Sequence, residues 1–310
     1  MKGLSLSGGG VLGAAQAGML YRAFETDKEF IRYKYPADYW QYISGTSIGA
    51  LNGLLIAMKY TAREIYEIWY NIKKSDLLSY NFNVFESIYK RHKMKKFIEN
   101  LIIKKFGTSE VKFDDIELIC GVDLNCFATV VQTGKALVFG KDFINCNVVD
   151  AIMMTTAYPV AFPPIEISSK KTNEKFQVID GGILNNSPIL PLIKSGCDDI
   201  TILSIGNLNK NFSLSGPMST LKRVLEFVTI GNEFVSLSWA SHIMKDKIKV
   251  YRCECEDVGP FDWNKIHVIL EKGIKSWENG PVGPNEIITQ YSTSTIDEEG
   301  IEENIIKGNI

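Results

Sequence analysis

The sequence predicts an α/β fold, because strand-like runs and helix-favouring stretches alternate along it. Residues 1–6 form a short apolar run that leads through a glycine-rich turn into a helix-favouring stretch, and the same order recurs between residues 39 and 58. A third strand-like run, 176–179, ends in an acidic residue and two glycines, at the strand end where α/β sheets carry functional groups. With 310 residues, 45% of them hydrophobic, the chain is long enough for one large or two small cores.

The first turn is Ser7-Gly8-Gly9-Gly10-Val11-Leu12-Gly13, which joins the run 1–6 to a predicted helix over 14–24. Glycine accepts positive φ without a Cβ penalty, so the loop can present bare N–H groups at a helix N-terminus. Such a loop stabilises an anion, either a phosphate or the oxyanion of an acyl transfer. The Gly8-x-Gly10-x-x-Gly13 spacing also fits a dinucleotide site, with Asp27 or Glu29 near the ~20-residue distance of a ribose-binding acid.

The second turn favours acyl transfer. An aromatic and β-branched strand, 39–44, runs into Gly45-Thr46-Ser47-Ile48-Gly49, and residues 50–58 then favour a helix. Strand, G-x-S-x-G and helix are the parts of a nucleophile elbow, which makes Ser47 the candidate nucleophile. The Ile48 N–H and the loop Gly8 to Gly10, chiefly Gly9 and Gly10, would then donate to the oxyanion.

The middle of the chain is helical and basic. We expect helices over 62–74 and 85–106. The region Lys90 to Lys105 is strongly basic, and it has two interpretations: an ordinary solvated helix face, or a contact with an anionic membrane surface. Its basic residues are Lys90, Arg91, Lys93, Lys95, Lys96, Lys104 and Lys105.

The candidate base lies farther along the chain. We expect strands over 118–131 and 136–139, a helix over 147–158 that prolines stop, and the strand 176–179. That strand delivers Asp180-Gly181-Gly182. None of the histidines, His92, His242 and His267, follows a strand as a triad histidine does, so Asp180 is the candidate proton acceptor. Burial would raise the pKa of its carboxyl and make it a better base.

The remaining elements complete one domain. We expect a strand over 200–206, a helix over 218–244, a strand over 247–252 and a closing helix over 263–277. The motifs lie within 4–206, and the domain is predicted to span 1–277. Residues 278–310 are polar and rich in Gly and Pro, so we expect a C-terminal tail.

Composition and the pattern of apolar runs limit which binding partners and which cellular compartment we expect. A net charge of −2 gives no reason to expect nucleic acid. No signal-peptide pattern opens the chain and no apolar run reaches the ~18 residues of a membrane span, so we expect a cytoplasmic protein, peripheral to membranes if it binds them. Cys253-Glu254-Cys255 is the closest cysteine pair, and the scattered cysteines favour reduced structural thiols over zinc.

Taken together, the sequence resembles the patatin-like phospholipases. The likeness rests on four segments in matching order: the turn 7–13, the turn 45–50, Thr155-Thr156-Ala157-Tyr158-Pro159-Val160-Ala161-Phe162-Pro163-Pro164, and Asp180-Gly181-Gly182-Ile183-Leu184-Asn185-Asn186-Ser187-Pro188. Many relatives carry a basic residue after the three glycines, where this chain has Val11.

The resemblance implies a three-layer α/β/α fold with a mostly parallel central sheet. It also implies a serine lipid acyl hydrolase of the phospholipase A or lysophospholipase type, with membrane phospholipid or another acyl lipid as substrate. Ser47 and Asp180 would form a Ser-Asp dyad that works through an acyl-enzyme, the glycine loop would be the oxyanion hole, and no metal or cofactor is required.

Two other functions stay open from the sequence. A catalytically silent lipid-binding or regulatory module is consistent with the basic helix and with the weak basicity of an aspartate. A dinucleotide-binding oxidoreductase is consistent with the first glycine loop, although the second strand ends in Gly45-Thr46-Ser47 and not in an acid. The sequence leaves the oligomeric state open.

Overall fold

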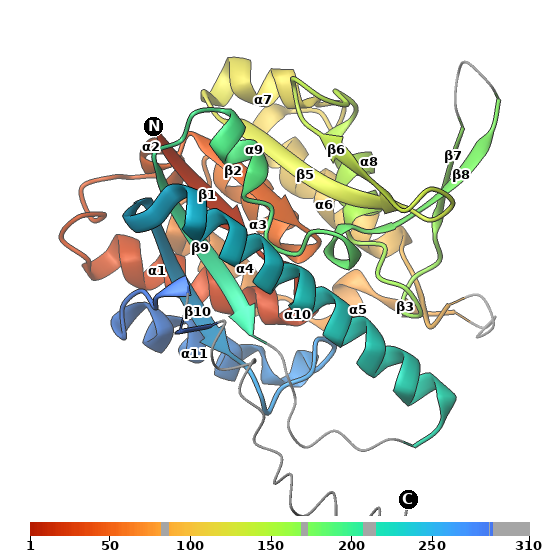
Figure 1. Cartoon of the computed structure of the whole chain (residues 1–310). Helices are drawn as coiled ribbons and strands as arrows, with labels where there is room; N and C mark the ends of the chain where they lie inside the picture. Colours follow the sequence, from red (N-terminus) through yellow and green to blue (C-terminus); the bar gives the residue numbers. More distant parts are fainter. Residues whose placement is uncertain (82–86, 169–172, 207–214, 285, 288–310) are drawn as a thin grey trace, which may run out of the picture.

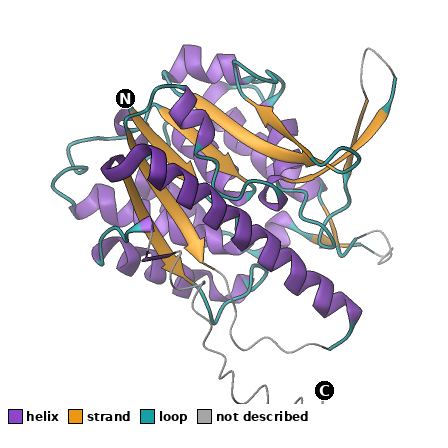
Figure 2. Ribbon diagram, viewed as in Figure 1, coloured by secondary structure: helices purple, strands orange, loops and turns teal. Residues whose placement is uncertain are grey.

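The computed structural model describes residues 1–81, 87–168, 173–206, 215–284 and 286–287. A mixed sheet of eight strands lies at its centre (Figures 1 and 2). The strands are Lys2–Leu6 (β1), Tyr42–Thr46 (β2), Asp123–Val130 (β5), Lys135–Phe139 (β6), Ile165–Ser168 (β7), Lys175–Asp180 (β8), Asp199–Gly206 (β9) and Ile248–Glu254 (β10).

The strand order is β10-β9-β1-β2-β5-β8-β7, and β6 pairs with β5. The strands β10, β9, β1, β2 and β5 pair in parallel, whereas β6, β7 and β8 join the sheet antiparallel. The expected mostly parallel sheet is therefore confirmed. A small separate hairpin pairs Ser79–Tyr80 (β3) with Tyr89–Lys90 (β4).

Helices cover both faces of the sheet and give the expected three layers (Figure 1). Leu4 and Leu6 of β1 pack into the larger hydrophobic cluster with most of the helices. Ile200 and Ile202 of β9 pack into a second cluster, against α9 and Leu237 of α10. The helices are Ala14–Thr26 (α1), Pro36–Tyr39 (α2), Ile48–Ala57 (α3), Ala62–Asn71 (α4), Lys74–Leu77 (α5), His92–Phe106 (α6), Phe113–Cys120 (α7), Val148–Thr155 (α8), Leu190–Lys194 (α9), Pro217–Met244 (α10) and Ile266–Glu278 (α11).

The pairing register brings the ends of β2 and β8 together. Residues 123–127 of β5 pair with β2, and residues 128–130 of the same strand pair with β8. Both partners lie on the edge of β5 opposite β6, because β6 pairs with residues 126–130 of the other edge. The two strands therefore run head to head: Thr46 pairs with Phe127, and Asp180 pairs with the next residue, Ala128. Ser47 and Asp180 are consequently neighbours in space.

Several predicted elements have different bounds, and three differ most. The strand expected over 118–131 is split into α7 and β5 by Gly121, whose left-handed φ of 71° ends the helix. The helix expected over 85–106 starts only at His92, after β4, and the first two residues of its predicted span, 85 and 86, lie outside the described residues. The helix expected over 147–158 ends at Thr155.

The packed domain also continues beyond Glu278. Val282 donates its amide to the Val250 carbonyl of β10 at 2.8 Å, and Ile287 is buried in the second cluster. The predicted tail therefore cannot begin at 278, and its remainder, 288–310, lies outside the described residues. Within the described part of the chain, the helices lack the length or the apolar composition needed to cross a membrane.

Candidate active site

Ser47 sits on a strained turn between β2 and α3. Its φ of 54° and ψ of −127° are unfavourable for a residue with a Cβ, as expected for a nucleophile elbow. Gly49 permits this turn, because a Cβ there would stand 2.4 Å from the Leu6 carbonyl oxygen. Gly45 is equally restricted, since its Cβ would meet the Gly49 carbonyl oxygen at 2.6 Å. Both motif glycines thus have a steric role.

Thr155 holds the elbow from the other side. The Ser47 N–H donates a 2.9 Å hydrogen bond to Thr155 Oγ1, at the end of α8. Thr46 Oγ1 donates to the Asn185 carbonyl at 2.7 Å, which ties the end of β2 to the loop that follows Asp180. Thr155 opens the segment 155–164 that resembles the patatin-like phospholipases, but its sequence context does not indicate this contact. Its role depends on a contact across 108 positions of chain, which no local pattern reveals.

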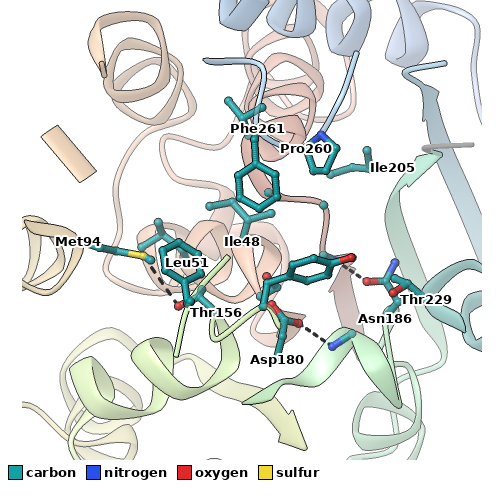
Figure 3. A pocket seen from close by; sticks show the side chains of 18 of the residues that line it. Ile48, Leu51, Met94, Thr156, Asp180, Asn186, Ile205, Thr229, Pro260 and Phe261 are labelled. Carbon is teal, nitrogen blue, oxygen red and sulfur yellow. Dashed lines mark hydrogen bonds between the residues drawn. The ribbon is translucent and has the colours of Figure 1, made fainter. Parts of the chain in front are cut away.

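Asp180 is 2% exposed and ends β8 beside this elbow. Its Oδ1 accepts the Gly182 N–H at 2.8 Å, whereas its buried Oδ2 has no hydrogen-bond partner among the described residues (Figure 3). Burial raises the pKa of Asp180 from 3.8 to about 6, against the opposing effects of the Ser47 hydroxyl, the Gly182 amide and the Arg91 charge. Oδ2 is therefore the carboxylate oxygen left to accept a proton.

The hydroxyl of Ser47 influences this carboxylate without a fully formed hydrogen bond. It lies close enough to lower the pKa of Asp180, yet no bond of good geometry joins the two side chains. Long or poorly aligned contacts between nucleophile and base are common before a substrate is bound.

The glycine loop divides its amides between two tasks. The Gly8 N–H donates to both the backbone oxygen and Oδ1 of Asn186, each at 3.2 Å, so the expected oxyanion donor at Gly8 instead anchors the loop. The amides of Gly9, Gly10 and Ile48 have no acceptor among the described residues and lie at the pocket. These three remain the candidate oxyanion donors.

The other motif glycines allow close backbone approach. A Cβ at Gly13 would stand 2.6 Å from Ile48 Cγ1, and one at Gly181 would stand 2.2 Å from the Phe127 carbonyl oxygen. Gly182 has more room, with its nearest neighbour, Asn186 Oδ1, at 3.0 Å, and serves through its amide. Each of these glycines therefore helps neighbouring backbone segments of the candidate site to lie close together.

A pocket of about 120 Å³ joins these groups. Ser47, Asp180 and the glycine loop line it together with apolar side chains of several elements, some of which Figure 3 shows around Asp180. Such a cavity suits an apolar chain attached to a polar reacting group. Its apolar lining includes Leu51, Leu77, Met94, Ile98, Ile152, Phe162, Ile205, Ile230 and Phe261.

Arg91 is a buried cation that sequence reasoning placed on a basic surface. It is 8% exposed, and its Nη2 donates to the Met153 carbonyl and, at 2.9 Å, to Thr156 Oγ1. Its Nε and Nη1 have no hydrogen-bond partner among the described residues. Burial lowers the pKa of Arg91 to about 10, and the Asp180 charge opposes that shift. The charged guanidinium of Arg91, which does not itself line the pocket, thus lowers the pKa of Asp180.

The other candidates lie elsewhere. His92, His242 and His267 are exposed and do not line the pocket. Asp27 and Glu29 follow the end of α1 opposite to the glycine loop, about 20 Å along the helix, so they do not form a ribose site with it.

The cysteines form no metal site in the described chain. Cys253 and Cys255 are buried with their sulfur atoms 3.6 Å apart. No cluster of three or more His, Cys, Asp or Glu side chains suited to a metal occurs in the part of the chain that the structure describes.

The basic region is partly engaged in local contacts. Lys93 Nζ donates to the Ser75 carbonyl at 2.8 Å, Lys95 lies 3.8 Å from Asp150, and Lys105 lies 3.6 Å from Glu64. The opposite side of α6 contributes Met94 and Ile98 to the pocket. Some lysines of the basic region therefore hold α6 against neighbouring elements of the fold.

Two known proteins are similar to this chain in sequence. A "cGAMP-activated phospholipase" of Escherichia coli (strain TW11681) is 27% identical over 254 residues, covering 71% of this chain. The chain spans 65% of the length of that relative. An "Uncharacterized protein R571" of Acanthamoeba polyphaga mimivirus is 25% identical over 296 residues, covering 89% of this chain and 92% of that protein.

A solved structure and a family model also match this chain. The crystal structure of VipD from Legionella pneumophila superimposes with a TM-score of 0.52 at 14% identity, covering 90% of this chain and 66% of that one, and so shares the fold. The model of the patatin-like phospholipase family matches residues 4–193, which include the elbow, the glycine loop and Asp180. The chain belongs to the patatin-like phospholipase family.

Proposed function

We propose that this chain is a serine lipid acyl hydrolase of the phospholipase A or lysophospholipase type. The observation that carries the proposal is the head-to-head register of β2 and β8, which sets strained Ser47 beside buried Asp180 at the end of an apolar pocket. The family itself supports lipid hydrolysis. The ester carbonyl is placed against Ser47, and the acyl chain occupies the apolar pocket.

The proposed reaction has two half-reactions. Ser47 Oγ attacks the ester carbonyl while its proton passes to Asp180 Oδ2, and the amides of Gly9, Gly10 and Ile48 stabilise the oxyanion. Collapse of this intermediate forms the acyl-enzyme, and the proton on Asp180 goes to the departing alcohol. Water then attacks the acyl-enzyme, giving its proton to Asp180, and the fatty acid leaves as Ser47 is reprotonated.

Fatty acid release from phosphatidylcholine and lysophosphatidylcholine vesicles tests the proposal. We expect Ser47→Ala to lower kcat by about 10⁴-fold and Asp180→Asn by about 10³-fold, because each removes a group that takes part in bond making. Ser44→Ala is the matched control. Ser44 is a buried serine of β2 whose hydroxyl has no hydrogen-bond partner among the described residues, so this variant should keep the wild-type rate.

Each assay is run with and without cGAMP, since one relative carries that activator in its name. A rate that depends on Ser47 under either condition supports the proposal. Folded protein that binds vesicles but releases no fatty acid under both conditions supports the lipid-binding or regulatory module instead.

A further inference from the structure

An exposed apolar stripe follows the long helix α10. Its members, spaced by three, four or seven residues, lie on one helix face and are between 39% and 68% exposed. We call them the α10 stripe: Leu221, Val224, Val228, Val235 and Trp239. Figure 1 shows α10 crossing one face of the sheet, with its N-terminal end projecting past the neighbouring elements.

The opposite face of α10 is the one that packs against the rest of the fold. Leu237, Ala240 and Met244 pack into the second hydrophobic cluster, and Ile230 is buried at the pocket. The stripe is therefore additional apolar surface. A contiguous exposed patch of this kind marks a contact with another apolar phase or partner.

The charges of α10 favour a bilayer of anionic lipids. Both acidic residues of the helix, Glu226 and Glu233, are buried, at 9% and 1% exposure. The ionisable side chains on its exposed surface are basic or histidine, with Lys222 near the start and His242 near the end, and Lys245 follows the helix. An apolar face that carries a tryptophan, on a helix with Lys222 near its start and Lys245 after its end, resembles in composition a helix that lies in a membrane interface.

The helix that carries the stripe also forms part of the pocket wall, with its opposite face. Glu226, Thr229 and Ile230 line the pocket, while the adjacent Phe227 and Val228 are exposed. The stripe and the pocket thus lie on opposite sides of one helix.

We propose that the α10 stripe is the surface through which this protein binds a lipid bilayer, with α10 lying along the membrane. This inference rests on the proposed function, because membrane binding would bring a lipid hydrolase to its substrate. It assigns the main membrane contact to α10 and not to the basic helix α6.

Flotation with vesicles of phosphatidylcholine and phosphatidylglycerol tests the inference. All proteins carry Ser47→Ala, so that binding is measured without hydrolysis. We expect Val235→Glu with Trp239→Glu to reduce vesicle binding at least about tenfold, because two charges would enter the interface. Leu118→Glu with Ile119→Glu is the matched control on α7, where these side chains are 85% and 64% exposed, and it should bind as the parent does.

A third variant separates the two candidate surfaces. Lys96→Glu with Lys104→Glu on α6 should retain most of the binding. Undiminished binding by the α10 variant, or loss of binding in the α6 variant alone, overturns the inference. An α10 variant that instead converts a dimer into a monomer in sedimentation, with vesicle binding intact, assigns the stripe to a second copy and also overturns it.

Failure of the proposed function can be told apart from failure of this inference. With Ser47 restored, the α10 variant should hydrolyse a soluble short-chain ester at the wild-type rate, because neither Val235 nor Trp239 lines the pocket. Absence of hydrolysis in every protein rejects the proposed function, while the flotation result still decides whether α10 binds the bilayer.

Discussion

A single buried carboxylate sets the chemistry that this site can perform. Asp180 combines one oxygen fixed by Gly182 with another that has no hydrogen-bond partner among the described residues. Burial brings its pKa to about 6, so near neutral pH the group is ionised and is a stronger base than an exposed aspartate. The same burial predicts two measurable effects of pH.

The first effect concerns activity. Because the proposed base must be ionised, kcat/KM should rise with pH through a midpoint near the Asp180 pKa of about 6 and then level off. Arg91 lowers that pKa, so Arg91→Met should move the midpoint upward, while Arg91→Lys should leave it nearer the wild-type value. Identical midpoints in the wild type and Arg91→Met would exclude this electrostatic role.

The other groups that act on Asp180 are the Ser47 hydroxyl and the Gly182 amide, and the charged Asp180 in turn raises the pKa of Tyr158.

The second effect concerns stability. The pKa of Asp180 is higher in the folded protein than its ordinary value of 3.8, so the folded state holds its proton more tightly and loses stability as pH rises from about 4 to 6. Asp180→Asn should therefore raise the free energy of unfolding by about 2 kcal/mol near pH 8, with little gain near pH 4. Denaturant unfolding at both pH values measures this. A gain that is larger at the acid pH would contradict the sign.

Among the elements, α1 and α11 depend on glycines where they cross. A Cβ at Gly273 of α11 would stand 2.0 Å from the Ala15 carbonyl oxygen, and one at Gly18 of α1 would stand 2.2 Å from that of Leu270. Neither backbone can move away without disturbing the layer that supports the sheet beneath the glycine loop.

Gly273→Ala should lower the free energy of unfolding by about 2–3 kcal/mol, because its methyl group would overlap backbone atoms. Gly231→Ala in α10 is the matched control: nothing lies within 4 Å of its Cβ, and alanine should stabilise the helix by about 0.5–1 kcal/mol. Equal effects of the two substitutions in thermal unfolding would show that the crossing tolerates a side chain.

Local patterns predicted the elements that carry the proposed chemistry better than those around them. The two glycine turns and Asp180 were found because strand, turn and helix signals adjoin in the sequence. The boundary at Gly121 was missed because an apolar run over 118–131 fits both a helix end and a strand. The exposed Leu118 and Ile119 made that run look like one buried strand.

At the scale of the whole molecule, a buried polar network joins α10 to the glycine loop. Glu233 Oε1 accepts hydrogen bonds from Ser187 at 2.8 Å and Ser204 at 2.7 Å, and Oε2 accepts from Asn186 at 3.4 Å. Arg252 lies 3.6 Å from the same carboxylate. Since Asn186 also accepts a hydrogen bond from the Gly8 amide, the proposed membrane helix and the glycine loop share one set of contacts. These partners are far apart in sequence, as are Arg91 and Asp180, so patterns along the chain could not predict them.

Glu233→Ala should lower the free energy of unfolding by about 3 kcal/mol or more, because it removes the buried acceptor of three donors beside a buried arginine. The matched control is Glu226→Ala, the other buried acid of α10, whose ion pair with Arg223 spans one turn of the same helix at 3.0 Å. That substitution should cost less than Glu233→Ala, because both partners of this pair keep some contact with solvent, at 15% and 10% exposure. Denaturant unfolding compares the two, and an equal cost would show that the network adds nothing beyond an ordinary ion pair.

The most direct test of the proposed chemistry is labelling with a fluorophosphonate probe followed by mass mapping. The folded protein, in the presence of vesicles and cGAMP, should carry a single adduct on Ser47. Ser47→Ala should carry none, and Asp180→Asn should react far more slowly, since its amide cannot accept the serine proton. An adduct on another residue, no adduct on folded protein, or wild-type labelling of Asp180→Asn would contradict the proposed pair.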